Sequence, residues 1–416
     1  MSGGRDPSGA ISRRAFVGAA GLASAGLLAT AYSTPAAATA DDETDARRAI
    51  VPFHATHQAG IATPTQDCLV FAAYDVAEPD RSALLGLLGT WTDASARLCL
   101  GEPLAGDTYP AAPAPDTGEA LGLGPASLTV TAGFGPGLFD GRFGLADRAP
   151  SALADLPSFA GDALDPTRSG GDLCIQACAD DPQVAFHAVH NLTRLALGTA
   201  TLRYLQLGFG RASSTSTQQS TPRNLMGFKD GTDNLTAQEP DLLERFVWVG
   251  SEGDQSWMRD GTYLVARRIR IHLEEWDRSA LQEQEQAVGR DKASGAPLGG
   301  TAERDPVNLG AKGKDGLPVI PAGAHIRVAA PATNGGERIL RRGFNFADGV
   351  DPVTGELDAG LYFICFQRDP RRQFVPIQTR LSEQDSMSRY LLHTASGLFA
   401  CPRGPVRGGS WGDPLS

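Results

Sequence analysis

The sequence predicts an α+β protein made of two ferredoxin-like domains with antiparallel sheets. Three observations lead to this prediction. The chain has 416 residues, enough for two domains. Strands and helices follow one another in a similar order in each half, although the sequence itself does not repeat. A polar stretch rich in serine and threonine lies at 209–222, so we place the domains at 45–215 and 216–416.

The elements of the first half follow from the spacing of its apolar residues. Short apolar or alternating runs have the length of strands, and leucines at helical spacing indicate a helix after the first of them. The expected elements, in order, are a strand over 67–74, a helix from Arg81 towards Trp91, strands over 127–135 and 172–179, a helix over 182–197 and a strand over 201–208.

The same patterns return in the second half. They predict a strand over 261–272, a helix over 274–285, strands over 325–329 and 360–367, and a helix over 382–392.

The N-terminus is typical of a targeting segment. Arg13 and Arg14 precede a phenylalanine and a weakly apolar run of alanine, glycine and leucine, which is a twin-arginine pattern. Small residues before Asp41 offer a cleavage site, so residues 1–40 are predicted to be a signal peptide. The run is too short and too rich in glycine for a permanent membrane span, although a retained anchor is the alternative. We expect export to the periplasm or the cell exterior.

Charge and cysteine usage narrow the classes of function. The formal net charge is −11, and loss of the basic leader makes the mature chain more acidic, which argues against nucleic-acid binding. The six cysteines lie mostly in apolar runs and are predicted to be buried thiols. Cys174 and Cys178 alternate as in a strand and lack a second zinc-ligand pair. His54 and His57 could be half of a metal site, but a structural role is the better interpretation.

The most informative segment runs from Arg223 to Thr232. At its centre Asp230 lies between Gly227 and Gly231, which allow the backbone to bend sharply and to approach a flat ligand. A Lys-Asp-Gly turn is often only a surface turn. Here Leu225, Met226 and Phe228 surround it, and this apolar setting places Asp230 near a core or a cofactor.

Further polar residues follow in the second half. On the expected strand, His325, Arg327 and Ala329 share one face. Arg341 and Arg342 come sixteen residues later, and Glu383 and Asp385 lie on the expected last helix. Taken singly, a strand histidine is usually structural and paired arginines are usually a solvated edge.

Together these motifs resemble the dye-decolourising peroxidase family. The resemblance is carried by Gly-Phe-Lys-Asp-Gly at 227–231, the His-Ile-Arg that begins at His325 and the Leu-Arg-Arg-Gly at 340–343. Segments 53–61 and 289–298 extend it to nearly the whole mature chain, with Ala55 where glycine is commoner. The secreted twin-arginine branch, which includes iron-uptake-linked haem peroxidases, is the most similar in pattern.

The resemblance implies one haem b per chain, held between the sheet and the helices of the C-terminal half. It implies that His325 is the axial iron ligand, with Asp385 as its carboxylate partner and Glu383 as second candidate, and that Asp230 and Arg341 act on the opposite side. Arg341 is preferred over Arg342 because it is the first of the pair. The other implied cofactor contacts are Gly231, Thr232, Asp233, Ala330, Pro331 and Ala332.

The implied activity is a peroxidase that reduces hydrogen peroxide and oxidises dye-like, phenolic or other small reducing substrates. Iron release from haem in iron acquisition is the alternative, and a binding module without haem is a third reading. Since an aspartate beside a fixed arginine stays ionised at lower pH than a histidine, we expect an acid optimum. Tyr390, Trp257 and Tyr263 are candidate electron relays, although packing is the commoner role of such residues. A homo-oligomer is left open.

Overall fold

The computed structural model describes residues 49–77, 80–106 and 109–416. The expected signal peptide, residues 1–40, lies outside this part. No helix within the described ranges is long and apolar enough to cross a membrane.

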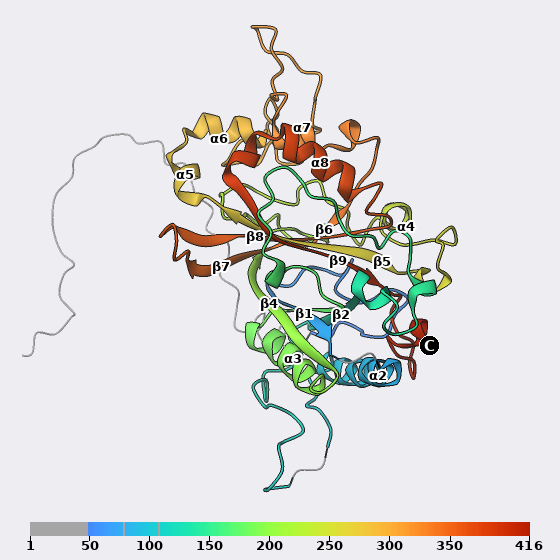
Figure 1. Ribbon diagram of the computed structural model, residues 1–416. Helices are drawn as coiled ribbons and strands as arrows, with labels where there is room; N and C mark the ends of the chain where they lie inside the picture. The colour runs from blue at the N-terminus through green and yellow to red at the C-terminus, as the bar shows by residue number, and fades with distance from the viewer. Residues whose placement is uncertain (1–48, 78–79, 107–108) are drawn as a thin grey trace, which may run out of the picture. The chain divides into compact units, whose positions relative to one another are not determined.

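Antiparallel strands form the centre of the fold (Figure 1). In the described residues nine strands make one sheet of order β5-β9-β2-β3-β1-β4-β7-β8-β6. Because β5 also pairs with β8, the sheet closes on itself as a barrel, and β6 pairs with β8 beyond β7 on the edge opposite β5. The strands are β1 (Cys68–Val76), β2 (Thr129–Phe134), β3 (Leu173–Ala179), β4 (Ala200–Arg211), β5 (Thr262–Ile271), β6 (Leu340–Arg341), β7 (Phe344–Val350), β8 (Leu357–Gln367) and β9 (Leu391–Cys401).

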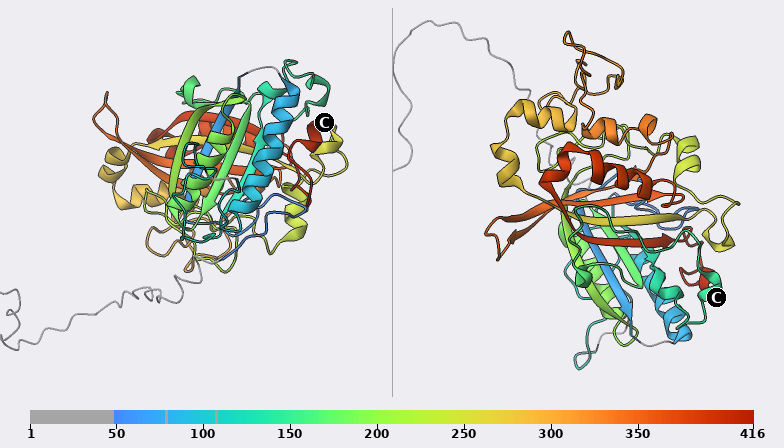
Figure 2. Two further views of the ribbon diagram at one scale, coloured as in Figure 1. Left: turned by 90° about the horizontal axis from the view of Figure 1, so that it is seen from below. Right: turned by 45° about the horizontal axis from the view of Figure 1, so that its top comes forward.

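Helices cover the barrel in two groups. Helices α2 (Arg81–Leu98) and α3 (Pro182–Leu195) lie across the strands of the first half, as Figure 2 shows. A second group lies over the strands of the second half (Figure 1) and consists of α5 (Leu273–Arg278), α6 (Leu281–Val288), α7 (His325–Val328) and α8 (Phe374–Gln384). The short α4 is Pro240–Phe246. The 3₁₀ turns are Pro136–Phe139, Ala146–Arg148, Pro166–Arg168, Ser256–Met258, Pro331–Thr333, Ser386–Tyr390 and Asp413–Leu415.

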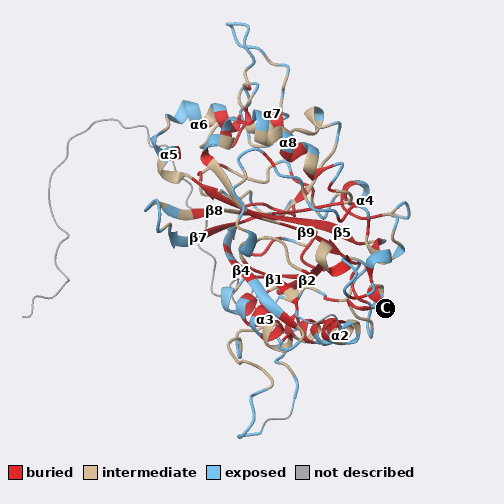
Figure 3. Ribbon diagram, in the orientation of Figure 1, coloured by how far each residue is buried: buried red, intermediate tan, exposed pale blue. Residues whose placement is uncertain are grey.

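Strands β2, β3 and β5 are buried along their whole length, which explains their nearly continuous apolar runs, whereas β4 and β7 are partly exposed (Figure 3). One core fills the barrel interior and includes Phe71, Tyr362 and Phe399. Another lies outside it beneath α2 and α3 and includes Trp91. The elements of the first half therefore agree with their predicted positions, because a run of buried residues needs no knowledge of its partners to be recognised.

Helix starts in the first half have the expected caps. The Asp80 carboxylate accepts hydrogen bonds from the backbone N–H groups of Ser82 (2.8 Å) and Ala83 (3.1 Å) at the start of α2. Asp181 caps α3 in the same way, and Pro182 supplies the first turn. These local interactions explain why both helices begin where the sequence indicates.

Three predictions of the second half are wrong in detail. Residues 325–329, expected as a strand, form the short helix α7, since a run of this length does not distinguish the two periods. The helix expected over 274–285 is interrupted between α5 and α6, where Ala280 is extended. The helix expected over 382–392 ends at Gln384, because Asp385 has extended backbone angles (φ −77°, ψ 122°) and its carboxylate caps the next turn.

The sheet joins the two halves of the chain. Strand β2 meets β9 at Phe134 and Ala400, and β4 meets β7 at Phe209 and Asn345. The α+β class with antiparallel strands is therefore confirmed. The division into ferredoxin-like domains at 45–215 and 216–416 stays an interpretation.

Candidate haem site

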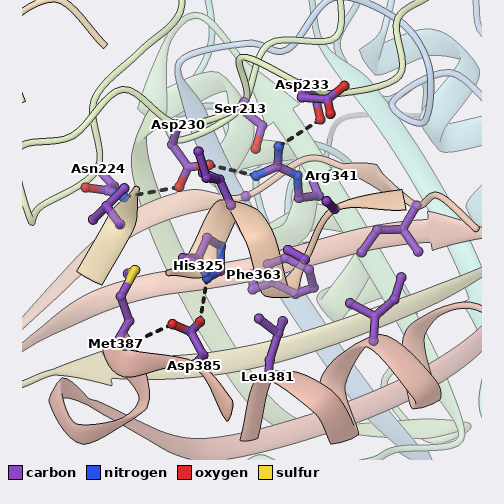
Figure 4. Close-up of a pocket in the computed structure, with 18 of the residues that line it drawn as sticks. Ser213, Asn224, Asp230, Asp233, His325, Arg341, Phe363, Leu381, Asp385 and Met387 are labelled. Carbon is purple, nitrogen blue, oxygen red and sulfur yellow. Dashed lines mark hydrogen bonds and ion pairs between the residues drawn. The ribbon is translucent and has the colours of Figure 1, made fainter. Parts of the chain in front are cut away.

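A deep cavity lies between the outer face of β5 and β8 and the helices α7 and α8 (Figure 4). Its volume is about 560 Å³, within the range of cofactor pockets. Apolar side chains form most of its wall, among them Ile269, Ile271, Leu361, Phe363, Phe374, Ile377, Leu381 and Met387. Such a wall suits a large flat apolar ligand.

Asp230 enters this cavity from an irregular turn. Gly227 and Gly231 adopt positive φ angles of 84° and 88°, which L-residues rarely adopt, so the turn needs glycine at both positions. The carboxylate accepts a hydrogen bond from Arg341 Nη1 at 2.8 Å and one from Asn224 Nδ2 at 3.2 Å. Both of its oxygens are therefore oriented (Figure 4).

Arg341, the last residue of β6, and Arg342, which follows it, point in opposite directions, as neighbours in an extended chain do. Arg341 lines the cavity, and its Nη2 also donates to the carbonyl of Asp233 at 3.2 Å. Arg342 is fully buried and donates to the carbonyls of Thr63 and Pro64. Arg341 is thus the arginine that faces the cavity.

His325 lies at the start of α7 with its imidazole against the same cavity. Its Nδ1 is 2.6 Å from Oδ2 of Asp385, whose side chain is only 3% exposed. Burial alone would lower the pKa of His325, but the charge and hydrogen bond of Asp385 outweigh it and raise this pKa. Glu383, the other candidate partner, is exposed.

The remaining predicted contacts also line the cavity, namely Gly231, Thr232, Asp233, Ala330, Pro331 and Ala332. In Figure 4 the Asp230–Arg341 pair and the His325–Asp385 pair lie one above the other. The fold thus brings together residues that are up to 155 positions apart in the sequence, between Asp230 and Asp385.

Several other residues singled out in the sequence have structural contacts instead. His54 Nδ1 bonds to the carbonyl of Pro405 at 3.0 Å and His57 Nδ1 to that of Asp260 at 2.8 Å. Cys174 and Cys178 are buried free thiols in the barrel interior. Within the described ranges no group of three or more His, Cys, Asp or Glu side chains could hold a metal ion.

The three candidate relay aromatics are all outside the cavity wall. Trp257 donates to the carbonyl of Arg148 at 2.9 Å, and Tyr263 is buried. Tyr390 is 1% exposed and packs edge-on against Trp276, with 4.9 Å between ring centroids. These contacts are those of packing residues, and a relay role stays a prediction.

Two polar residues that contact the segment around Asp230 were not assigned a role from the sequence. Asn224 orients Asp230, and its own Oδ1 accepts from the Met226 N–H at 3.1 Å, as an asparagine at the start of a turn does. An asparagine at the start of a glycine-containing turn was therefore the sequence feature that could have indicated Asn224. Glu303, which binds the turn through its side chain, lies in an irregular segment without any pattern that could have indicated it.

The donor set fits a haem. The Nδ1 atom of His325 bonds to Asp385, and no described residue hydrogen bonds to Nε2, so this nitrogen is available to bind a metal. The wall is apolar, as the porphyrin face requires, and charged donors gather around Asp230. Fold and site are thus those expected of a haem-binding oxidoreductase.

Comparison with known proteins identifies the family. The Dyp-type peroxidase N-terminal domain matches residues 58–210 and the C-terminal domain matches 221–406. The dye-decolorizing peroxidase of Thermobifida fusca is 40% identical over 362 residues, which are 84% of this chain and 81% of that protein. The chain belongs to the Dyp-type peroxidase family, and it is a haem-dependent peroxidase.

Other relatives agree with this assignment. The deferrochelatase of Yersinia pestis is 38% identical over 84% of this chain and 80% of its own. The crystal structure of a DyP-type peroxidase from Streptomyces coelicolor superposes with a TM-score of 0.83 at 42% identity, over 92% of this chain and 99% of that one. Ferric DtpA from Streptomyces lividans has the same TM-score at 41% identity and the same coverage.

Proposed function

We propose that this peroxidase holds its haem in the cavity between β5, β8, α7 and α8, reduces hydrogen peroxide there and oxidises dye-like, phenolic or other small reducing substrates. The observation that supports this most directly is the presence of His325–Asp385 and Asp230–Arg341 in one apolar cavity. Haem, when bound, supplies the redox-active iron at which peroxide is reduced.

His325 would hold the iron through Nε2. The hydrogen bond from Nδ1 to Asp385 fixes the ring orientation and makes the imidazole a more basic ligand. Because the Asp385 side chain is buried, water does not weaken this interaction.

Asp230 and Arg341 act on the peroxide. Asp230 takes one proton of hydrogen peroxide on its carboxylate and gives it to the oxygen that leaves as water. Arg341 stabilises negative charge on that oxygen while it also keeps Asp230 in place at 2.8 Å. Since a carboxylate and not an imidazole accepts the proton, we expect turnover to be highest in acid.

The test is the absorption spectrum of the purified protein before and after one equivalent of peroxide. The wild-type protein should show a Soret band that shifts on addition. In Asp230→Asn the band should be present but its shift slowed by roughly 10²-fold or more. An unchanged rate in this variant would exclude Asp230 as the proton carrier.

A second candidate function is iron release from haem, with peroxidase activity secondary. It is supported by the relatives named deferrochelatase. Incubation of the haem-loaded protein, followed by separate assays for free iron and for intact porphyrin, tests it. Iron release with an intact ring would support this function, and ring cleavage or no release would not.

We also propose export by the twin-arginine route, based on Arg13 and Arg14. Replacement of both arginines by lysine should retain the protein in the cytoplasm. Export of this variant at the wild-type level would contradict the proposed route.

A further inference from the structure

The turn that carries Asp230, residues 221–232, has little regular structure to hold it. Its backbone pairing is local: an isolated bridge joins Arg223 and Lys229, and short-range bonds include that from the Asp230 N–H to the Pro222 carbonyl at 2.9 Å and that from the Gly227 N–H to the Asn224 carbonyl at 2.9 Å. We name this segment the Asp230 turn. Gly227 and Gly231, which lie on either side of Asp230, have positive φ angles, and we infer that the turn depends on side-chain contacts for its position.

Glu303 supplies such contacts from a distant segment. Its Oε1 accepts hydrogen bonds from the hydroxyls of Thr221 and, at 3.2 Å, Thr232. Its Oε2 forms an ion pair with Nζ of Lys229. One carboxylate therefore binds the two ends of the Asp230 turn and the residue next to Asp230.

The ion pair is enclosed by packed backbone. The side chains of Lys229 and Glu303 are only 25% and 17% exposed. A methyl group at Gly295 would lie 2.7 Å from Cδ of Lys229 and 3.4 Å from Cγ of Glu303, so the backbone at Gly295 lies directly against the pair. The carbonyl of Glu303 accepts a bond from Arg290 at 3.1 Å, which fixes the segment that carries it.

The ion pair between Lys229 and Glu303 also affects the charge near Asp230. Lys229 lines the same cavity as its neighbour Asp230, and an ammonium without Glu303 would be free to pair with that carboxylate in competition with Arg341. Burial tends to raise the pKa of Glu303, but the bonds from Lys229 and Thr221 outweigh it and lower this pKa. Glu303 thus stays ionised in the acid range expected for turnover.

We propose that Glu303 is a positioning residue for the peroxide reaction. It binds Thr221, Lys229 and Thr232, keeps the Asp230 turn against the cavity and keeps the charge of Lys229 away from Asp230. This role rests on the proposed function of Asp230 as the proton carrier.

Hydrogen exchange of the purified protein tests the position of the turn without any turnover. Glu303→Ala should increase deuterium uptake in peptides that cover 221–232. Glu303→Gln retains an oxygen that can accept from the threonines and should give a smaller increase. The control Glu283→Gln removes an exposed ion pair to Arg389 outside the cavity and should leave these peptides unchanged.

Kinetics test the effect on the reaction. Glu303→Ala should lower kcat/KM for hydrogen peroxide by roughly ten-fold or more, since a small displacement of a catalytic group costs this much, while KM for the reducing substrate stays the same. The double variant Glu303→Ala with Lys229→Met should recover part of this loss, because the released charge is removed. No recovery would overturn the part of the proposal that concerns charge.

Wild-type exchange over 221–232 in Glu303→Ala, or an unchanged kcat/KM for peroxide, would overturn the proposal. If the alanine variant does not fold, Glu303→Gln decides by the same two measurements. Failure of the proposed function has a different signature, because Asp230→Asn would then react with peroxide at the wild-type rate while the exchange difference in Glu303→Ala would persist.

Discussion

At the scale of single residues, the site depends on which of two similar neighbours faces the cavity. Arg341 and Arg342 have the same chemistry, yet one lines the cavity and the other is buried against backbone carbonyls. Asp385 and Glu383 also differ in their surroundings: Asp385 bonds to His325, whereas Glu383 is exposed. The backbone direction at each position makes the difference.

Substitution of the two arginines should therefore separate catalysis from stability. Arg341→Leu should reduce peroxide turnover by roughly 10²- to 10³-fold, as loss of a charge-stabilising donor does, with an almost unchanged free energy of unfolding. Arg342→Leu should lower the free energy of unfolding by about 3 kcal/mol, since buried carbonyls lose their donors. Stopped-flow mixing and urea unfolding measure the two effects. The reverse pattern would mean that Arg342 is the catalytic residue.

Asp385, the carboxylate partner of His325, should affect the reduction potential of the bound iron and the affinity for haem. Asp385→Asn keeps a hydrogen-bonding group but removes the negative charge, so the reduction potential of the bound iron should rise and haem affinity should fall by about 10-fold. Potentiometric titration and haem transfer to apomyoglobin measure these quantities. Glu383→Gln, on the exposed neighbour, is the matched control. Equal effects of both variants would show that Asp385 has no special role.

At the scale of elements, the Asp230 turn works through its backbone conformation. Gly231 has φ of +88°, and a methyl group there would lie 3.0 Å from Cα of Ser213 and from the backbone nitrogen of Ser214. The turn thus approaches another part of the chain as closely as backbones allow. A side chain would both strain the turn and push it away.

Gly231→Ala should consequently reduce peroxide turnover and the free energy of unfolding together. The left-handed conformation alone costs alanine roughly 1–2 kcal/mol, and the contact adds to this. Gly316→Ala is a matched control, since Gly316 has φ of +79° but no atom within 4 Å of the added methyl group. The control should lose stability only. If both variants turn over peroxide equally, the close approach at Gly231 does not position Asp230.

Elements of the second half were harder to predict than those of the first, and His325 shows why. The alternation at 325–329 suits a strand, but α7 forms because neighbouring segments, not local periodicity, decide the conformation of four residues. Strand β9 was not predicted at all. Its first residues, Leu391 and Leu392, directly follow the turn that Asp385 caps, and the preceding helix pattern continues into them.

At the scale of the whole molecule, closure of the sheet places both chain halves around shared cores. It also buries titratable groups, among them His393 on β9 at the edge of the cavity. Burial and the nearby charge of Arg267 lower the pKa of His393 from its ordinary 6.5 to about 4, although Asp162 opposes this. The folded protein therefore keeps this imidazole neutral.

Stability of the haem-free protein should depend on pH through this group. The unfolded chain binds a proton at His393 near pH 6.5, and the folded chain does so only near pH 4. His393 therefore does not affect the free energy of unfolding above pH 6.5, and it lowers this free energy as the pH falls from 6.5 to 4. The loss amounts to roughly 3 kcal/mol by pH 4. Urea unfolding at pH 7, 5.5 and 4 should show a smaller decline for His393→Gln than for the wild type. Parallel declines would contradict the assignment.

By itself, the sequence determined the α+β class, most elements of the first half, and the motifs around Asp230, His325 and Arg341. These follow from local causes, namely periodicity, caps, and glycines that a turn requires. Only the tertiary structure decided that β5 pairs with β8 to close the sheet, that Asp385 rather than Glu383 meets His325, and that Glu303 binds the Asp230 turn. Each of these joins residues far apart in the chain, and a contact of that kind depends on the path of the backbone between them, which no local pattern specifies.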